Sequence, residues 1–357
     1  MFIVMSTFVY SPFCIASDYE QTYGIASTVD YDSNPTLSSK NKQSLFRYNL
    51  TPTYSFSKID EVQHLIIDAA LNLQRSSNSQ ISSDRKDPTF NVAWLYSGER
   101  NTYDAIFNYA KSSTRFSELT ESGAIQRDGS ALNKSLSVGW GRSISEVLNS
   151  KINASISDST FSGANLNSYQ SKSVSANLNY AYSLYTSPFV QASFSDYKTQ
   201  LTPTRNSSSY IIGSTFLLSD RLSWNFNTGL NISSSSGTGF IGKLGANYQN
   251  EYSTLSVVID RAVSATGLND SQKSDSFNLA YNYTLNDLSS IGAAVSFRNT
   301  QSIFASKIRT LDGYYSKKIN PNWDMRVTLS DRDYVTNTDS AHGNIIGFSL
   351  IYKYPSF

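Results

Sequence analysis

The sequence predicts an all-β fold, a transmembrane antiparallel β-barrel of about eighteen strands with short periplasmic turns and long extracellular loops. Aromatic residues make up 13% of the chain although the hydrophobic share is only 39%. Stretches of about ten residues alternate between apolar and polar side chains. No apolar run that could span a membrane as a helix follows the N-terminus. A polar average with many rings fits a barrel wall, because only alternate residues face lipid.

The first segment, residues 1–16, is expected to be an export signal, which leaves residues 17–357 for the barrel. Phe2-Ile3-Val4-Met5 and Phe8-Val9-Tyr10 form an apolar region, and Cys14-Ile15-Ala16 provides small residues for cleavage. Cleavage after Ala16 removes the one cysteine of the chain. The mature protein is therefore expected to have neither a disulfide framework nor a thiolate metal site.

Alternation with a period of two assigns each later stretch an outward, lipid-facing set of side chains. Helical spacing fits none of these stretches. The residues between the apolar ones are mostly Ser, Thr, Asn, Gln or single charges, which we assign to the lumen. The outward sets are Phe46, Tyr48, Leu50 and Tyr54; Phe90, Val92, Trp94 and Tyr96; Val174, Ala176, Leu178, Tyr180 and Tyr182; Trp224, Phe226, Leu230 and Ile232; Phe277, Leu279, Tyr281 and Tyr283; and Phe348, Leu350, Tyr352 and Tyr354.

Short turns alternate with longer polar loops along the whole chain. A soluble β-sandwich would also show repeated short strands, but it would not explain this alternation. With an even number of strands, both termini lie on the periplasmic side. The expected turns are 57–60, 98–101, 143–146, 184–186, 219–221, 250–252, 286–287 and 320–322, and the clearest long loops are 33–44, 76–88, 114–130 and 264–274.

Rings gather near both kinds of connection, which predicts two aromatic girdles at the membrane surfaces. The chain ends at Phe357 behind an amphipathic last strand, as expected of a protein that the outer-membrane barrel-assembly machinery recognises. Pro355 cannot donate a hydrogen bond to a strand ladder, so pairing is expected to end there. These features predict an integral protein of a Gram-negative outer membrane.

The same alternation predicts which charged side chains line the lumen. Positive and negative groups are nearly balanced among them, which predicts a wet interior with weak ion selectivity. No plug domain is expected before the first strand, so any constriction comes from the long loops, of which 114–130 is the longest. Alternatively, the charges pair across the lumen and only brace the wall. The predicted pore-lining residues are Arg47, His64, Asp68, Asp104, Lys151, Lys243, Asp260, Arg298, Asp312, Asp324, Arg326 and Lys353.

Few residues suggest chemistry, so we expect no enzyme, no metal and no cofactor. No nucleophile motif accompanies His64, the net charge of +1 gives no footprint for nucleic acid, and no loop has calcium-site spacing. Acidic groups do cluster in two loops, which we expect to be solvated. They are Asp331, Asp333 and Asp339 with His342 on the last long loop, and Asp30 and Asp32 after the first strand.

Four cations have outward parity but lie next to long loops: Lys134, Lys172, Arg261 and Arg309. Their long stems can lie along apolar surface while their charged ends reach the phosphates of lipopolysaccharide. Projection into water is the equal alternative. Outer-membrane lipid and lipopolysaccharide are therefore the expected partners of the wall.

Three segments resemble the β-barrel porin 2 family of outer-membrane proteins. They are Val29-Asp30-Tyr31-Asp32-Ser33-Asn34-Pro35, Ser117-Glu118-Leu119-Thr120-Glu121-Ser122-Gly123 and Leu218-Ser219-Asp220-Arg221-Leu222. The resemblance spans most of the mature chain, although the motifs are short. It implies a barrel that works beside an exopolysaccharide export system, with polysaccharide and periplasmic export proteins as partners, and it carries over no catalytic residue.

Three functions follow as hypotheses. The first is a porin-like channel for the export or surface passage of a polysaccharide. Inward Ser, Asn and Thr can exchange hydrogen bonds with sugar hydroxyls, and the inward rings of Phe189, Tyr197 and Tyr314 can stack on sugar faces. The second is a general diffusion porin for small polar solutes. The third is a closed structural or adhesive barrel whose surface loops bind a partner.

Overall fold

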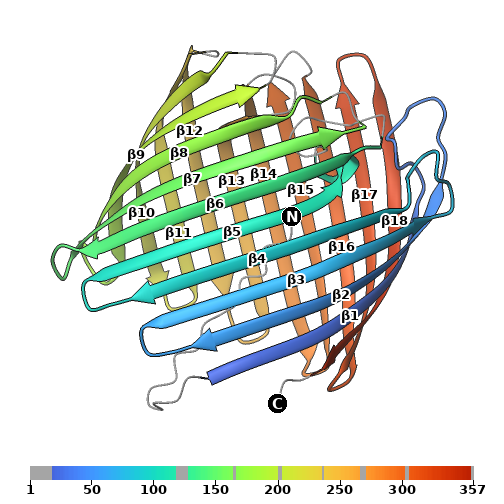
Figure 1. The fold of residues 1–357 in the computed structure, drawn as a ribbon, viewed down its shortest axis with the longest axis horizontal. Helices are drawn as coiled ribbons and strands as arrows, with labels where there is room; N and C mark the ends of the chain where they lie inside the picture. Colours follow the sequence, from blue (N-terminus) through green and yellow to red (C-terminus); the bar gives the residue numbers. More distant parts are fainter. Residues whose placement is uncertain are drawn as a thin grey trace.

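A computed structural model describes residues 18–117, 128–163, 166–199, 203–234, 237–265, 271–301 and 305–354. The expected export signal, residues 1–16, and Phe357 lie outside these ranges. The described chain forms strand after strand around a closed wall (Figure 1). No helix in the described ranges is long and apolar enough to cross a membrane.

The strands follow one another along the chain with one short helix, α1 (Thr114–Ser117), after the fifth strand. Their bounds are β1 Asp18–Asp32, β2 Leu45–Ile59, β3 Gln63–Ser76, β4 Arg85–Ser97, β5 Asn101–Ser113, β6 Ser130–Ser143, β7 Leu148–Ser162, β8 Tyr169–Tyr180, β9 Thr186–Thr199, β10 Arg205–Ser219, β11 Leu222–Ser233, β12 Gly237–Gln249, β13 Ser253–Ala265, β14 Ser271–Asn286, β15 Ser289–Gln301, β16 Ser306–Asn320, β17 Trp323–Thr336 and β18 Ser340–Tyr354.

Every strand pairs antiparallel with the next, and β1 pairs with β18 to close the wall. This closed barrel of 18 strands confirms the predicted fold class. Closure removes the unpaired strand edges that an open sheet would present. Because Tyr23 of β1 pairs with Tyr354 of β18, the first strand begins and the last strand ends at the same rim, the rim of the short turns.

The strands are longer than the alternation predicted. They run from 12 residues in β8 to 16 in β14, so the expected loops 76–88 and 264–274 are shorter than we predicted. The acidic cluster assigned to the last loop lies mostly on strands, with Asp331 and Asp333 in β17 and His342 in β18. Ladder hydrogen bonds satisfy the backbone whatever the side chains are, so pairing continues into polar segments beyond the apolar band.

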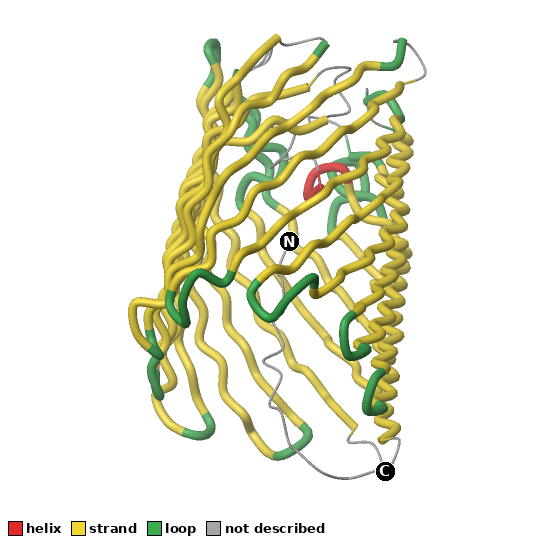
Figure 2. The backbone as a smooth tube through the Cα atoms, turned by 90° about the vertical axis from the view of Figure 1, so that its left-hand side faces the viewer, coloured by secondary structure: helices red, strands yellow, loops and turns green. Residues whose placement is uncertain are grey.

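Directly paired residues share a face of the wall, so the register carries the assignment from strand to strand. In β2, Phe46 and Tyr48 are 46% and 52% exposed, whereas Arg47 between them is 5% exposed. The exposed apolar face is the outer wall, and the face of Arg47 is the inner one. The large apolar side chains that are buried lie near the rim of the long loops, as do Leu37, Leu45 and Ile81. The short helix α1 lies within the barrel outline at this end (Figure 2).

Candidate functional site: the lumen and its narrowed mouth

The register places each predicted pore-lining residue on the inner face. Lys243 pairs with Asp260, Asp260 with Ser276, and Ser276 with Arg298, which makes one inward row across β12–β15. Asp312 lies between Ala294 and Ser330 on its neighbouring strands. The strand register establishes that these residues lie on the inner face. That they line a conducting pore stays a prediction.

Several of these residues contact one another along the wall. Lys151 Nζ lies 2.6 Å from Asp104, and Lys353 Nζ lies 3.6 Å from Asp324. The Arg326 guanidinium lies over the Tyr314 ring at 4.0 Å from its centroid. These contacts join strands that are neighbours or next neighbours. They brace the inner wall locally.

His64 contacts a serine but is not part of a triad with Asp68. His64 Nε2 lies 3.2 Å from Ser57 Oγ on the adjacent strand. Asp68 instead accepts hydrogen bonds from Ser55 Oγ at 2.6 Å and from Asn91 Nδ2 at 3.3 Å. Four residues along a strand span about 13 Å, so the Asp68 carboxylate cannot reach His64 on the same strand.

At the long-loop rim, a buried ion cluster joins β1, β2 and β17. Asp32 is fully buried and accepts hydrogen bonds from Arg332 at 2.9 Å and from Arg47 at 3.3 Å. Arg47 also donates to Asp30 at 2.6 Å. Sequence analysis found Arg47 but treated Asp30 and Asp32 as solvated loop residues. Arg332 is separated from Asp324 and Arg326 by an even number of positions on β17. This spacing could have placed Arg332 on the inner face.

A second cluster attaches α1 and its flanks to the inner wall. Arg85 donates to the carbonyl oxygens of Ser112 at 2.7 Å and Gly129 at 2.8 Å, and to Asp87 at 2.8 Å. Asp128 accepts from the Ser83 backbone N–H at 3.0 Å and from Ser113 Oγ at 2.8 Å. The connections on either side of β4 and β5 are thereby held together inside the rim.

The connection 33–44 covers the ends of β17 and β18. Asn34 is fully buried and donates to the backbone oxygens of Ser38 and His342, each at 2.9 Å. The two clusters hold α1 and the connections 33–44 and 77–84 inside the long-loop rim, on the side of β1–β6, β17 and β18 (Figure 2). These segments narrow the mouth on that side. The described ends of the predicted constriction loop 114–130 take part, together with 33–44 and 77–84.

The inner wall from β7 to β12 has a different character. Its described side chains include no carboxylate and only three cations, Lys151, Arg205 and Lys243. Hydrogen bonds between strands tie its polar groups together, such as Ser155 to Ser173 at 2.7 Å. Much of this face consists of small hydroxyl and amide side chains: Asn153, Ser155, Ser157, Ser171, Ser173, Ser175, Asn177, Gln191, Ser193, Ser195, Ser207, Ser209, Asn225, Asn227 and Asn231.

The three predicted inward rings differ in what covers them. Tyr197 is 5% exposed and packs on Tyr169 at 5.3 Å, so its faces are not open to the lumen. Tyr314 lies over Gly292, donates to Asn282 at 2.7 Å, and is covered by Arg326. Phe189 lies beside Gly213, where an added Cβ would come within 2.6 Å of the ring. The missing side chain lets the Phe189 ring lie against the wall.

On the outer face, Asp331, Asp333 and His342 form the candidate metal-ligand cluster among the described residues, with ligand atoms within 4.8 Å of one another. His342 Nδ1 lies 2.8 Å from Asp333, and Arg309 forms ion pairs with both aspartates. Both carboxylates are thus already engaged by the guanidinium. We therefore interpret the cluster as an ion-pair network on the outer wall.

No known family model matches the sequence, and no curated protein is detectably similar to it. The resemblance to the β-barrel porin 2 family thus stays a prediction. Among solved structures, Pseudomonas aeruginosa OpdO and OpdQ each share 10% identity over 95% of this chain and 98% of theirs, with TM-scores of 0.53 and 0.52. The siderophore receptor PirA of Acinetobacter baumannii shares 9% identity over 96% of this chain and 81% of its own, with a TM-score of 0.52. At such low identity the likeness shows the fold alone, and that fold is the 18-stranded barrel of outer-membrane porin structures.

Proposed function

We propose that the protein is an outer-membrane channel for polar solutes, with its long loops at the cell surface and both termini in the periplasm. The inner wall of β7–β12 carries this proposal. A closed barrel of this strand number encloses more space than side chains fill. A wall made mostly of hydroxyls and amides keeps that space wet.

The finer proposal is that the passing solute is a polysaccharide. Sugar hydroxyls can exchange hydrogen bonds with many equivalent Ser and Asn groups, so that each contact is weak and the chain can advance. Phe189, lying against the wall beside Gly213, can offer one ring face for stacking on a sugar. The three segments that resemble the β-barrel porin 2 family support the same substrate class.

The narrowed mouth favours a second candidate, a closed structural or adhesive barrel. Its buried clusters hold α1 and the connections 33–44 and 77–84 inside the rim. A general diffusion porin lies between the two, because a wall made mostly of hydroxyls and amides would pass many small polar solutes. The three functions differ in what they predict for ion current.

Single-channel recording in planar bilayers tests the proposal. A polysaccharide channel shows a stable open state that long neutral oligosaccharides block when added from the periplasmic side. An open state indifferent to such oligosaccharides supports the general porin and contradicts the polysaccharide. Absence of any conducting state, from protein shown to be folded by its heat-dependent gel mobility, contradicts both channel functions.

A further inference from the structure

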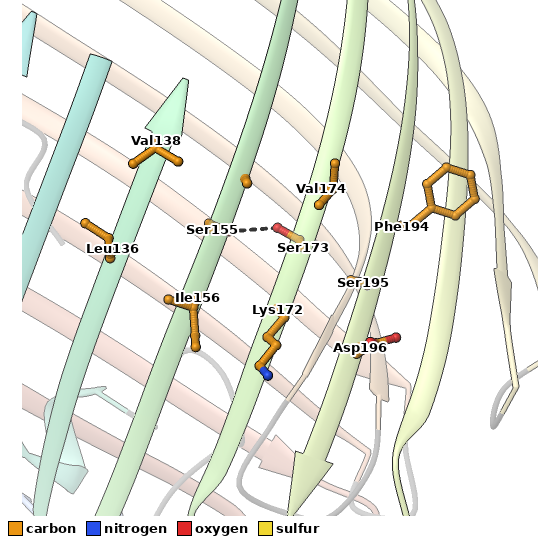
Figure 3. A pocket seen from close by; sticks show the side chains of 11 residues that line it. Leu136, Val138, Ser155, Ile156, Lys172, Ser173, Val174, Phe194, Ser195 and Asp196 are labelled. Carbon is orange, nitrogen blue, oxygen red and sulfur yellow. Dashed lines mark hydrogen bonds between the residues drawn. The ribbon is translucent and has the colours of Figure 1, made fainter. Parts of the chain in front are cut away.

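The outer wall is hollowed between β6 and β9, on the face that meets lipid (Figure 3). The hollow has a volume of about 360 Å³. Val138, Ala154, Val174 and Phe194 form one row of paired residues across it. Ala154 is the smallest member of that row, so it forms the floor between larger exposed neighbours.

A second hollow, of about 610 Å³, continues from the first on β8 and β9 and extends to β12. Ala176 and Ala192 are directly paired in it. Along β8 the outward residues are Lys172, Val174, Ala176 and Leu178, so the track leads from a lysine toward the turn rim. At about 3.3 Å per residue, these six steps cover roughly 20 Å of apolar surface.

Three lysines surround the long-loop end of this track. Lys172 lines the first hollow, and the next row toward the loops contains Lys134 and Lys198. Within the described part of the chain, none of these lysines forms an ion pair. The two other predicted outward cations differ, because Arg261 is paired with Asp275 and Arg309 with Asp333. Asp158 and Asp196 lie directly opposite Lys134 and Lys172 on the same face. Neither carboxylate forms an ion pair with these lysines in the described chain, so the patch carries three ammonium groups against two carboxylates.

We propose that this track binds a phosphorylated glycolipid of the outer leaflet. An acyl chain would lie over Ala154 and Ala176, and the lipid phosphate would bind to Lys134, Lys172 and Lys198. Lysine stems lie along apolar surface while the charged ends reach the headgroup level, which is the geometry this requires. The inference rests on the proposed orientation, in which the long loops and the lysines face the cell surface.

A hollow between β11 and β15 is the natural comparison. It has a volume of about 430 Å³ and is lined by Phe226, Leu244, Ile259 and Phe297, with Arg261 at its edge. There the guanidinium is held by both oxygens of Asp275, at 2.5 and 3.0 Å. A cation engaged in this way has less to offer a phosphate. The two hollows therefore differ in their outward cations. The lysines of the first form no ion pair among the described residues, whereas Arg261 of the second is paired with Asp275.

The test is a titration of the purified, delipidated barrel in detergent with a purified phosphorylated glycolipid, followed by native mass spectrometry. Lys172→Gln should weaken binding about fivefold, and the triple change of Lys134, Lys172 and Lys198 to glutamine should weaken it by the larger, multiplied factor. Ala154→Leu should also weaken binding, because leucine fills the floor. Arg261→Gln is the matched control and should bind as the unchanged protein does.

Two further probes decide the outcome. The dephosphorylated glycolipid should bind the unchanged protein as weakly as the phosphorylated form binds the triple variant. Equal affinity of all variants overturns the site, and phosphatidylglycerol binding as tightly as the glycolipid overturns the choice of an outer-leaflet ligand. Each variant is checked for heat-dependent gel mobility and for ion current. If the unchanged protein conducts ions but does not bind the glycolipid, the lipid site is wrong and the proposed channel stands. If it binds the glycolipid but does not conduct, the proposed channel is wrong and the lipid site stands.

Discussion

Asp32 lies at the centre of the buried ion cluster in the narrowed mouth. Its carboxylate is fully buried and is shared by Arg47 of β2 and Arg332 of β17. Removing one member of a buried ion cluster leaves the others charged without water or partner, which costs more than an intact pair contributes. The exposed pair of Arg261 and Asp275 is different, because solvent replaces a lost partner there.

Asp32→Ala should therefore lower the free energy of unfolding by about 3 kcal/mol or more. Asp275→Ala, which breaks the exposed pair, should lower it by less than about 1 kcal/mol. Reversible unfolding by guanidinium in phospholipid vesicles measures both variants. Equal losses in the two would mean that burial does not govern the energy of the mouth cluster.

Phe189 permits a second test at this scale. Phe189→Ala removes one inward ring without touching a charge, so oligosaccharide block should weaken about threefold to tenfold, as expected for lost stacking. Tyr197→Phe is the control, because Tyr197 is 5% exposed and its ring should not reach the solute. Concentration dependence of the block in single-channel records gives both values. A Phe189→Ala channel blocked like the unchanged one would exclude Phe189 as a sugar contact.

At the level of elements, the sequence predicted the number of strands and their faces well and their ends poorly. Period-two alternation is imposed by the lipid contact, so it is visible in β2 and β18 wherever the wall meets the apolar band. Beyond the band, lipid does not require apolar side chains at alternate positions. Polar residues such as Asp331 and Asp333 therefore belong to a strand whose sequence shows no apolar alternation. Strand parity could have placed Arg332 inside with Arg47, but the burial of the mouth cluster also depends on which loops fold inward, and the sequence did not predict that.

The α1 segment provides a prediction about an element. Asp128 ties it to Ser83 and Ser113, so Asp128→Ala should loosen the segment and increase the size and number of current fluctuations in the open channel. Asp158→Ala, on the outer face of β7, should leave the current unchanged. Single-channel recording under one voltage protocol compares them. Identical records from Asp128→Ala and unchanged protein would show that this element does not border the conducting path.

For the whole molecule, the balance of inward charges should show as weak ion selectivity. Asp260 lies between Lys243 and Arg298 in one inward row. Asp260→Asn removes the negative charge between those two cations and should shift the reversal potential in a salt gradient toward anion preference. Asp275→Asn, on the outer face of the next strand, should not shift it. A shift from both variants would point to a surface effect and against a contact with the lumen.

The face on which each charged side chain lies was predictable across the whole barrel, because successive residues of a strand point to opposite faces. Lys151 and Asp104 illustrate the limit, since parity placed both inside but did not predict that they lie 2.6 Å apart. Contacts between strands depend on register, which is set by turn geometry and bulges as well as by pattern. The substrate could not be predicted from the sequence, because a wall made mostly of hydroxyls and amides suits many solutes.

Closure between β1 and β18 has a consequence for the order of assembly. All other ladders join strands that follow one another, but Thr28 meets Ser349 across 321 positions and Asp32 meets Arg332 across 300. Contacts this distant along the chain form late, after local hairpins have reduced the search. A chain interrupted before β17 would keep two open edges and would lack Arg332 of the rim cluster. The last two strands thus complete both the wall and the mouth.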